Sequence, residues 1–258
     1  LTRPGEPDND ADYCLRLYEE CGTSAFAKLN GSFLIALYHL NSRELLLIND
    51  RFASRPLYYF HNNNQLMFGS QVRPLLKFRD MPRRLDEQAI FEFFSFQRTI
   101  GKKTFYKDIE ALSPACVLRF RDGSLSIEKY WHLRYTDETS AQAYYVEALA
   151  DRLRKAVTRR TRGHYRMGIL LSGGRDSRTV LGASGKGKFS VAFTLGDQIN
   201  KEVRTARRVA GVRGCRHVFL QRDFDHYVRL VDEAVDIGDG MGRFDNAHFI
   251  GFLRRMRE

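Results

Sequence analysis

The spacing of hydrophobic and polar positions changes near the middle of this chain. Up to residue 131, short apolar runs alternate with polar turns, a pattern typical of antiparallel strands. Apolar residues recur every three or four positions in only two places in this half, which predicts helices there. The expected strands lie at 32–40, 44–50, 56–60 and 65–70, with a turn at 61–64, and the expected helices lie at 13–27 and 85–96.

The stretch 115–131 predicts a further hairpin. Two strand-like runs flank Asp122 and Gly123, a residue pair that suits a two-residue turn with positive φ. Asp86 is expected in the first turn of the helix at 85–96, where it complements the positive end of the helix dipole. The first half of the chain is therefore predicted to be an α+β structure with antiparallel sheets.

After Trp131 the elements alternate between strand and helix. A helix is expected first, capped by Thr139 or Ser140 and carrying one apolar face. Strict alternation follows and predicts a parallel sheet with crossover helices, an α/β structure. The boundary lies near 132–140, which gives domains at 1–135 and 136–258. The apolar face comprises Tyr145, Leu149, Leu153, Ala156 and Val157; strands are expected at 166–171, 189–195 and 216–220, and helices at 177–184, 200–211 and 224–235.

The charge of the chain limits the classes of partner that it is expected to bind. Lys and Arg outnumber Asp and Glu by 42 to 31, which gives a formal net charge of +11. The basic residues are scattered, apart from a cluster at 152–166, and only Arg152, Lys155 and Arg159 align along a helix. We therefore expect no nucleic-acid partner, because such surfaces concentrate their basic residues. No apolar run approaches the roughly 18 residues of a membrane span, so no membrane partner is expected.

The cysteine and histidine patterns favour no metal site. Four cysteines form no C-x-x-C pair, which indicates reduced thiols and a cytoplasmic protein. The seven histidines share no spacing typical of metal ligands, so each is interpreted as a structural or a surface residue.

The stretch 168–180, GILLSGGRDSRTV, carries the candidate chemistry. It places a Ser-Gly-Gly turn between a predicted strand and a helix expected to start near Ser177. Ligands of parallel α/β sheets bind at the carboxyl ends of the strands, and free N–H groups at a helix N-terminus attract anions. Glycines allow close backbone approach, and serine hydroxyls add donors. The phosphate-binding groups are Ser172, Gly173, Gly174 and Ser177, with Asp176 suited to Mg²⁺ that bridges to phosphate.

These residues resemble the SGGxDS pyrophosphate loop of the N-type ATP pyrophosphatases. The first half supplies further motifs in order: LNGSFLIALY resembles DGxFAFALYD, NDRFASRPLYY resembles RDRFGxKPLYY, and QLMFGSQVRPLL resembles xLxFASExKALL. FYKDIEALSPACVLRF, followed by KYW, is similar to the end of a glutaminase domain. Together they resemble the glutamine-hydrolysing asparagine synthetase family over about residues 25–238.

The resemblance implies a class II glutaminase domain of the N-terminal-nucleophile fold, followed by an ATP-pyrophosphatase domain. It implies ATP and Mg²⁺ as cofactors, and aspartate or a related carboxylate with glutamine-derived ammonia as substrates. Leu170 and Leu195 match positions whose backbone faces adenine, while Ser172, Gly173, Gly174, Asp176 and Ser177 match the pyrophosphate loop, with Asp176 holding the metal. It also allows a homodimer.

Several departures leave alternatives open. No N-terminal Cys is present, Cys14 lies inside a predicted helix, and the motifs RGPD, YNGEIYN and SGEGSDE are missing. We therefore expect either a fragment of both domains, inactive alone and lacking glutaminase activity, or a degenerate paralogue. The acceptor carboxylate stays open between aspartate and a peptide or β-amino acid, as in lasso-peptide cyclases or β-lactam synthetases. A tRNA-modifying pyrophosphatase and a catalytically inactive interaction protein are the other hypotheses.

Overall fold

The computed structural model divides the chain into two compact units, each described by itself below. The first comprises residues 1–135 and 235–243, and the second comprises 136–234 and 244–258. The placement of 235–243 differs from the predicted division, because Asp239 accepts hydrogen bonds from the backbone and side chain of Arg73. His164, one of the seven histidines, and Asn63, in the predicted turn at 61–64, lie outside the described residues. The described residues are 9–62, 64–136, 139–163, 166–242 and 247–257.

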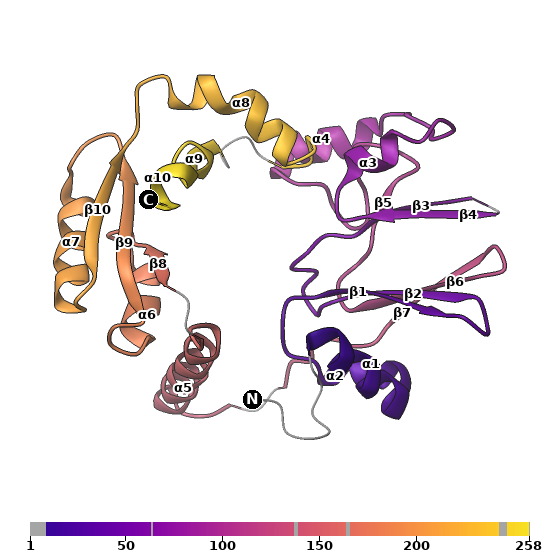
Figure 1. The fold of residues 1–258 in the computed structure, drawn as a ribbon, viewed down its shortest axis with the longest axis horizontal. Coiled ribbons are helices and arrows are strands. Elements are labelled where there is room, and N and C mark those ends of the chain that lie inside the picture. The colour runs from indigo at the N-terminus through magenta and orange to yellow at the C-terminus, as the bar shows by residue number, and fades with distance from the viewer. Residues whose placement is uncertain (1–8, 63, 137–138, 164–165, 243–246, 258) are drawn as a thin grey trace. The chain divides into compact units, whose positions relative to one another are not determined.

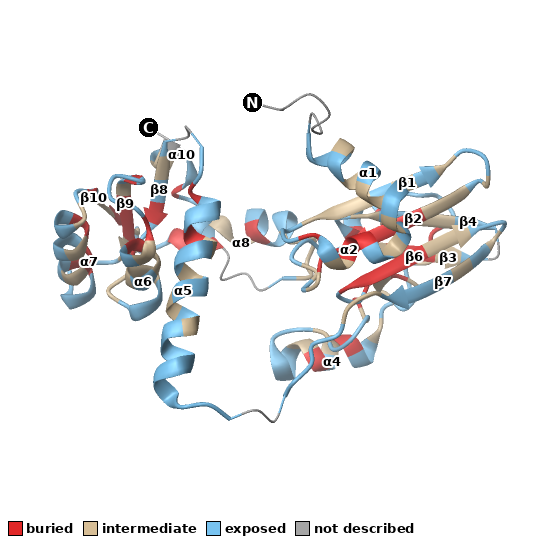
Figure 2. Cartoon of the chain, turned by 90° about the horizontal axis from the view of Figure 1, so that it is seen from below, coloured by how far each residue is buried: buried red, intermediate tan, exposed pale blue. Residues whose placement is uncertain are grey.

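The strands of the first unit form two antiparallel sheets, as the sequence predicts. Apolar side chains of β2 and β6 form much of its core and are buried (Figure 2). One sheet has the order β1-β2-β6-β7, with β1 at Leu34–His39, β2 at Glu44–Asn49, β6 at Cys116–Arg121 and β7 at Ser124–Lys129. The other has the order β4-β3-β5, with β3 at Tyr58–Asn62, β4 at Gln65–Gly69 and β5 at Glu110–Ala111.

The helices of the first unit modify two predictions. The helix expected at 13–27 is broken at Gly22, which adopts a φ of 60° that favours glycine. Asp86 is the N-cap and not a first-turn residue, since its side chain accepts a hydrogen bond from the N–H of Ala89 at 3.0 Å. The elements are α1 (Asp10–Cys21), η1 (Gly22–Ser24), α2 (Ala25–Lys28), α3 (Val72–Leu76) and α4 (Glu87–Phe96).

A buried carboxylate organises the loop after β2. Asp50 is 2% exposed and accepts hydrogen bonds from the N–H groups of Phe33, Phe52 and Ser54 and from the Ser54 hydroxyl. Burial alone raises the pKa of Asp50, but these donors outweigh it and hold the pKa below its ordinary value.

The predicted hairpin turn between β6 and β7 is also confirmed, since Asp122 and Gly123 have φ values of 49° and 78°.

The second unit is built on the predicted parallel sheet. The strand order is β10-β9-β8, with β8 at Met167–Leu170, β9 at Phe189–Gly196 and β10 at Arg216–Gln221. Its helices are α5 (Gln142–Arg160), α6 (Arg175–Ala183), α7 (Lys201–Val212), α8 (His226–Ile237, which ends in the first unit), α9 (Ala247–Ile250) and α10 (Leu253–Arg257).

Helices cover both faces of this sheet (Figure 1). On one face α6 and α7 pack on the strands over a buried cluster that includes Leu171, Leu181 and Ala206. On the other face Phe252 and Met256 contact a cluster around Phe193. The carboxyl ends of the strands are thereby held in place for a ligand site.

The predicted cap of α5 is wrong. The helix begins at Gln142 with Ala141 as its N-cap and no side-chain cap, while the N–H of Ser140 donates to the hydroxyl of Tyr145. Only Val157 of the predicted apolar face is buried, because little of the second unit packs against this helix (Figure 2).

Among the described residues, no helix is both long and apolar enough to cross a bilayer.

Candidate functional site at the carboxyl edge of the parallel sheet

The candidate loop turns directly from β8 into α6. The N–H of Leu171 donates to the carbonyl of Phe193 at 2.8 Å, which extends the pairing with β9 to the last residue before the turn. Helix α6 begins at Arg175, two residues before the predicted start, and its N-cap Gly174 provides no side-chain cap. The first-turn N–H groups therefore face the carboxyl edge of the sheet without an intrahelical acceptor.

The two serines brace this loop from inside. Their hydroxyl oxygens are 3.0 Å apart, and the Ser177 hydroxyl accepts a hydrogen bond from the N–H of Ser172 at 3.0 Å. The Ser172 hydroxyl in turn accepts the N–H of Gly174 at 3.1 Å. Both predicted donors thus lie in the loop, but here they bind each other and define its shape.

The glycines serve close packing. Neither Gly173 nor Gly174 has a positive φ. A Cβ on Gly173 would lie 2.7 Å from the Cα of Glu202 and 3.0 Å from its carbonyl oxygen. Real Cβ atoms essentially never approach backbone this closely, so the first turn of α7 excludes any side chain at residue 173.

An anion already accepts from the loop backbone. The Glu202 carboxylate, in the first turn of α7, accepts the N–H of Gly173 at 3.2 Å. Helix α7 is capped by Asn200, whose side chain accepts the N–H of Val203 at 3.1 Å. An oxygen anion therefore already lies at the position where a phosphate oxygen is expected.

Asp176 is the candidate metal ligand. It lies in the first turn of α6, its residue is exposed, and within the described part of the chain its carboxylate makes no hydrogen bond or ion pair. No group of three or more His, Cys, Asp or Glu suited to a metal occurs among the described residues. A single carboxylate fits Mg²⁺ nonetheless, because this ion is usually held by one or two carboxylates together with substrate phosphates and water.

A polar network on β9 and β10 holds the start of the loop at Leu171. The buried Thr194 hydroxyl, on β9, lies 2.7 Å from the carbonyl of Leu171, to which it donates, and 2.8 Å from Nε2 of His217. Since the single hydroxyl hydrogen is used on Leu171, Nε2 must carry the proton. Burial, followed by the nearby Arg207, lowers the pKa of His217, which favours this neutral ring.

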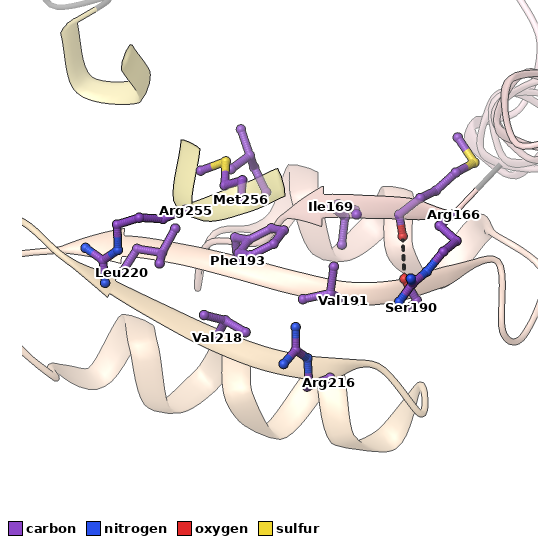
Figure 3. A pocket seen from close by; sticks show the side chains of 13 residues that line it. Arg166, Ile169, Ser190, Val191, Phe193, Arg216, Val218, Leu220, Arg255 and Met256 are labelled. Atoms are coloured by element: carbon purple, nitrogen blue, oxygen red, sulfur yellow. Dashed lines mark hydrogen bonds between the residues drawn. The ribbon is translucent and has the colours of Figure 1, made fainter. Parts of the chain in front are cut away.

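A cavity of about 710 Å³ lies on the face of the sheet that α10 contacts (Figure 3). Leu170, one of the predicted adenine-facing positions, lines it, whereas residues 172–177 do not. The apolar part of its lining includes Val191, Phe193 and Val218, which pack on the same face of the sheet as α10. Leu195, the other adenine-facing position, pairs with Leu220 near the end of β9, so the structure brings the predicted residues to one edge.

The first unit contains a second cavity, of about 670 Å³, beside β1. Cys14 lines it from α1 together with Asp10 and Arg55. Burial, with a smaller contribution from Asp10, raises the pKa of the Cys14 thiol, which disfavours the thiolate needed for nucleophilic attack.

The sequence patterns did not identify Glu202 and Thr194 as part of the site. Each had a detectable signal: Thr194 is a polar residue within the apolar run FSVAFTL, and Glu202 follows the N-cap Asn200 of the next helix. Their proximity to the loop depends on strand register and helix packing, which spacing alone does not give.

Two family models match the chain in succession. A model described as a glutamine amidotransferase domain matches residues 5–131, and one described as asparagine synthase matches residues 148–256. The candidate loop lies within the second match.

Individual relatives share a quarter or more of their aligned residues with this chain. Asparagine synthetase [glutamine-hydrolyzing] 3 of Bacillus subtilis is 28% identical over 68% of the chain and 29% of its own length. Asparagine synthetase [glutamine-hydrolyzing] 1 of the same organism is 25% identical over 88% of the chain and 37% of its own length. Amidase chyE of Penicillium rubens is 28% identical over 67% of the chain and 26% of its own length. The chain thus spans about a third of the length of these relatives.

Proposed function

Because this chain belongs to the asparagine synthetase family, we propose that its second unit binds Mg·ATP and serves amide formation through an acyl-adenylate. The two units are then a glutaminase of the N-terminal-nucleophile fold and an N-type ATP pyrophosphatase. The observation that carries the proposal is the N-terminus of α6, which has no side-chain cap, beside Asp176, which pairs with no residue in the described part of the chain, at the carboxyl edge of a parallel sheet.

The proposed reaction proceeds in two steps. A carboxylate oxygen of the acceptor attacks the α-phosphorus of ATP, and the bond to pyrophosphate breaks. Ammonia released from glutamine then attacks the acyl carbon, and AMP leaves with the electron pair of the C–O bond. Aspartate is the proposed acceptor; the similarity to a fungal amidase keeps another carboxylate as the second candidate.

The residues of the loop would each have a defined task. The first-turn N–H groups of α6 and the N–H of Gly173 would hold the β- and γ-phosphates, with the Glu202 carboxylate giving way to them. Asp176 would hold Mg²⁺, which neutralises charge on the departing pyrophosphate. Leu170 and Leu195 would present their backbone to the adenine, and the cavity beside Leu170 would receive its edge.

The test is carboxylate-dependent exchange of labelled pyrophosphate into ATP, measured on the protein as it is encoded. We expect exchange with aspartate or another carboxylate, and its loss in Asp176→Ala. Asp151→Ala is the matched control, because Asp151 is an exposed helical carboxylate that pairs with Lys155 on the same helix, α5. Exchange that survives in Asp176→Ala would remove this residue from the mechanism, and no exchange with any carboxylate would contradict the acyl-adenylate.

A further inference from the structure

Arg222 lies directly after β10, at the same edge of the sheet as the loop. Its Nε and Nη2 atoms donate to the two carboxylate oxygens of Asp197 at 2.9 and 3.0 Å. Its Nη1 atom donates to the hydroxyl of Tyr227 and lies 2.9 Å from Nδ1 of His248. The Arg222 side chain is only 17% exposed. These contacts hold the planar guanidinium on two sides, by Asp197 on one side and by Tyr227 on the other. Arg222 therefore has one orientation and holds Asp197 in a defined position.

The backbone of Arg222 holds the same neighbour. Its N–H donates to the carbonyl of Gly196 at 2.9 Å, immediately after the register pair of Gly196 with Gln221. Side chain and backbone of one residue therefore hold two successive residues, Gly196 and Asp197, at the end of β9. These residues directly follow Leu195.

The segment that Arg222 holds ends against the phosphate loop. Five residues after Asp197, Glu202 packs on Gly173 and accepts its N–H. Asn200 caps the helix between these two points. The segment 196–202 is thus fixed at one end by Arg222 and at the other by the loop, with Leu195 beside its first residue.

We propose that Arg222 is a positioning residue for the base side of the nucleotide site: it fixes the backbone at the end of β9 that receives the adenine. The proposal rests on the proposed function. Without the side-chain clamp, Asp197 loses its partner, and the end of β9 is held only by backbone hydrogen bonds such as that from residue 222 to Gly196. The phosphate loop keeps its shape, because its serine bonds and its pairing with β9 at Phe193 do not involve Arg222. Arg222 therefore matters for ATP and not for pyrophosphate alone.

The experiment compares ATP with pyrophosphate, each titrated in excess Mg²⁺ into the 258-residue chain by calorimetry. In Arg222→Met we expect the Kd for ATP to rise at least about fivefold, while the Kd for pyrophosphate changes less than about twofold. Arg229→Met is the matched control. Arg229 also pairs with aspartates, Asp223 and Asp225, but it is half-exposed and, among the described residues, makes no hydrogen bond or ion pair with Gly196 or Asp197. It should leave both affinities unchanged.

A second variant separates geometry from charge. Arg222→Lys keeps the charge but cannot bind both oxygens of Asp197 and Tyr227 at once, so it should resemble Arg222→Met. Normal ATP affinity in Arg222→Met or in Arg222→Lys would overturn the proposal, as would parallel loss of ATP and pyrophosphate. Wild-type chain that binds neither ligand would instead contradict the proposed function itself.

Discussion

Replacing Gly173 by alanine places one methyl group where the structure leaves no space. The added Cβ would lie 2.7 Å from the Cα of Glu202, 2.8 Å from its Cγ and 3.0 Å from its carbonyl oxygen. Two of these three atoms belong to the backbone of α7, so no side-chain rotation relieves the clash. Either the loop or the first turn of α7 must move, which also breaks the hydrogen bond from Gly173 to Glu202.

Overpacking of this kind costs about 1–3 kcal/mol. For a unit of about 100 residues, a loss of ~2 kcal/mol lowers the unfolding temperature by roughly 10 °C. The matched control is Gly182→Ala in α6, where an added Cβ meets nothing within 4 Å. Alanine should stabilise that helical position by up to about 0.5–1 kcal/mol.

Thermal unfolding followed by circular dichroism measures both variants, and calorimetry measures Mg·ATP binding. We expect Gly173→Ala to unfold at a lower temperature and to bind more weakly, and Gly182→Ala to unfold no earlier than wild type and to bind equally well. A Gly173→Ala protein as stable as wild type, with unchanged nucleotide affinity, would refute the close packing of the loop on α7.

Three other predictions concern pH, a buried carboxylate and the basic surface. Since burial and Arg207 lower the folded-state pKa of His217, stability should be fully present above about pH 6.5 and fall as pH drops towards the folded pKa. His217→Gln should show a shallower fall between about pH 5 and 7 in urea unfolding, and equal slopes would contradict the lowered pKa of His217. Asp50→Ala leaves several part-buried donors without their acceptor and should cost about 2–3 kcal/mol in the same assay, against near zero for Asp151→Ala. The chain should bind bulk tRNA no tighter than micromolar at about 150 mM salt; tighter binding that a triple Arg152, Lys155, Arg159→Glu variant loses would favour the tRNA-modifying hypothesis.

Local pattern was sufficient where a segment's structure depends on its own residues. The alternation of strand and helix after Trp131 predicted the parallel sheet, and Asp122-Gly123 predicted the hairpin turn. The start of α6 was placed two residues late, because nothing in the sequence told which residue after the glycines first takes helical geometry. The apolar face of α5 was predicted from spacing, but burial requires a packing partner, which spacing does not supply.

The candidate site divides in the same way. The strand-to-helix corner and its polar residues follow from SGGRDS alone. The contacts of Gly173 with Glu202, of Leu171 with Thr194, and of Asp197 with Arg222 join residues 23 to 29 positions apart. They depend on the register between strands and on the angle at which α7 leaves the sheet. Such contacts come from tertiary packing, so single-sequence patterns could suggest polar residues but not their partners.

The central claim is that residues 172–177 hold the phosphates of ATP with Mg²⁺ on Asp176. It is tested most directly by titrating ATP into the 258-residue chain, with excess Mg²⁺ or with EDTA, for wild type, Asp176→Asn and the control Asp151→Asn. The account predicts Mg²⁺-dependent binding for wild type and Asp151→Asn, and a loss of at least about tenfold in affinity for Asp176→Asn, since that variant keeps the shape of the side chain and removes only its charge. Equal Mg²⁺-dependent affinity in Asp176→Asn and wild type, or no binding by wild type, would contradict it.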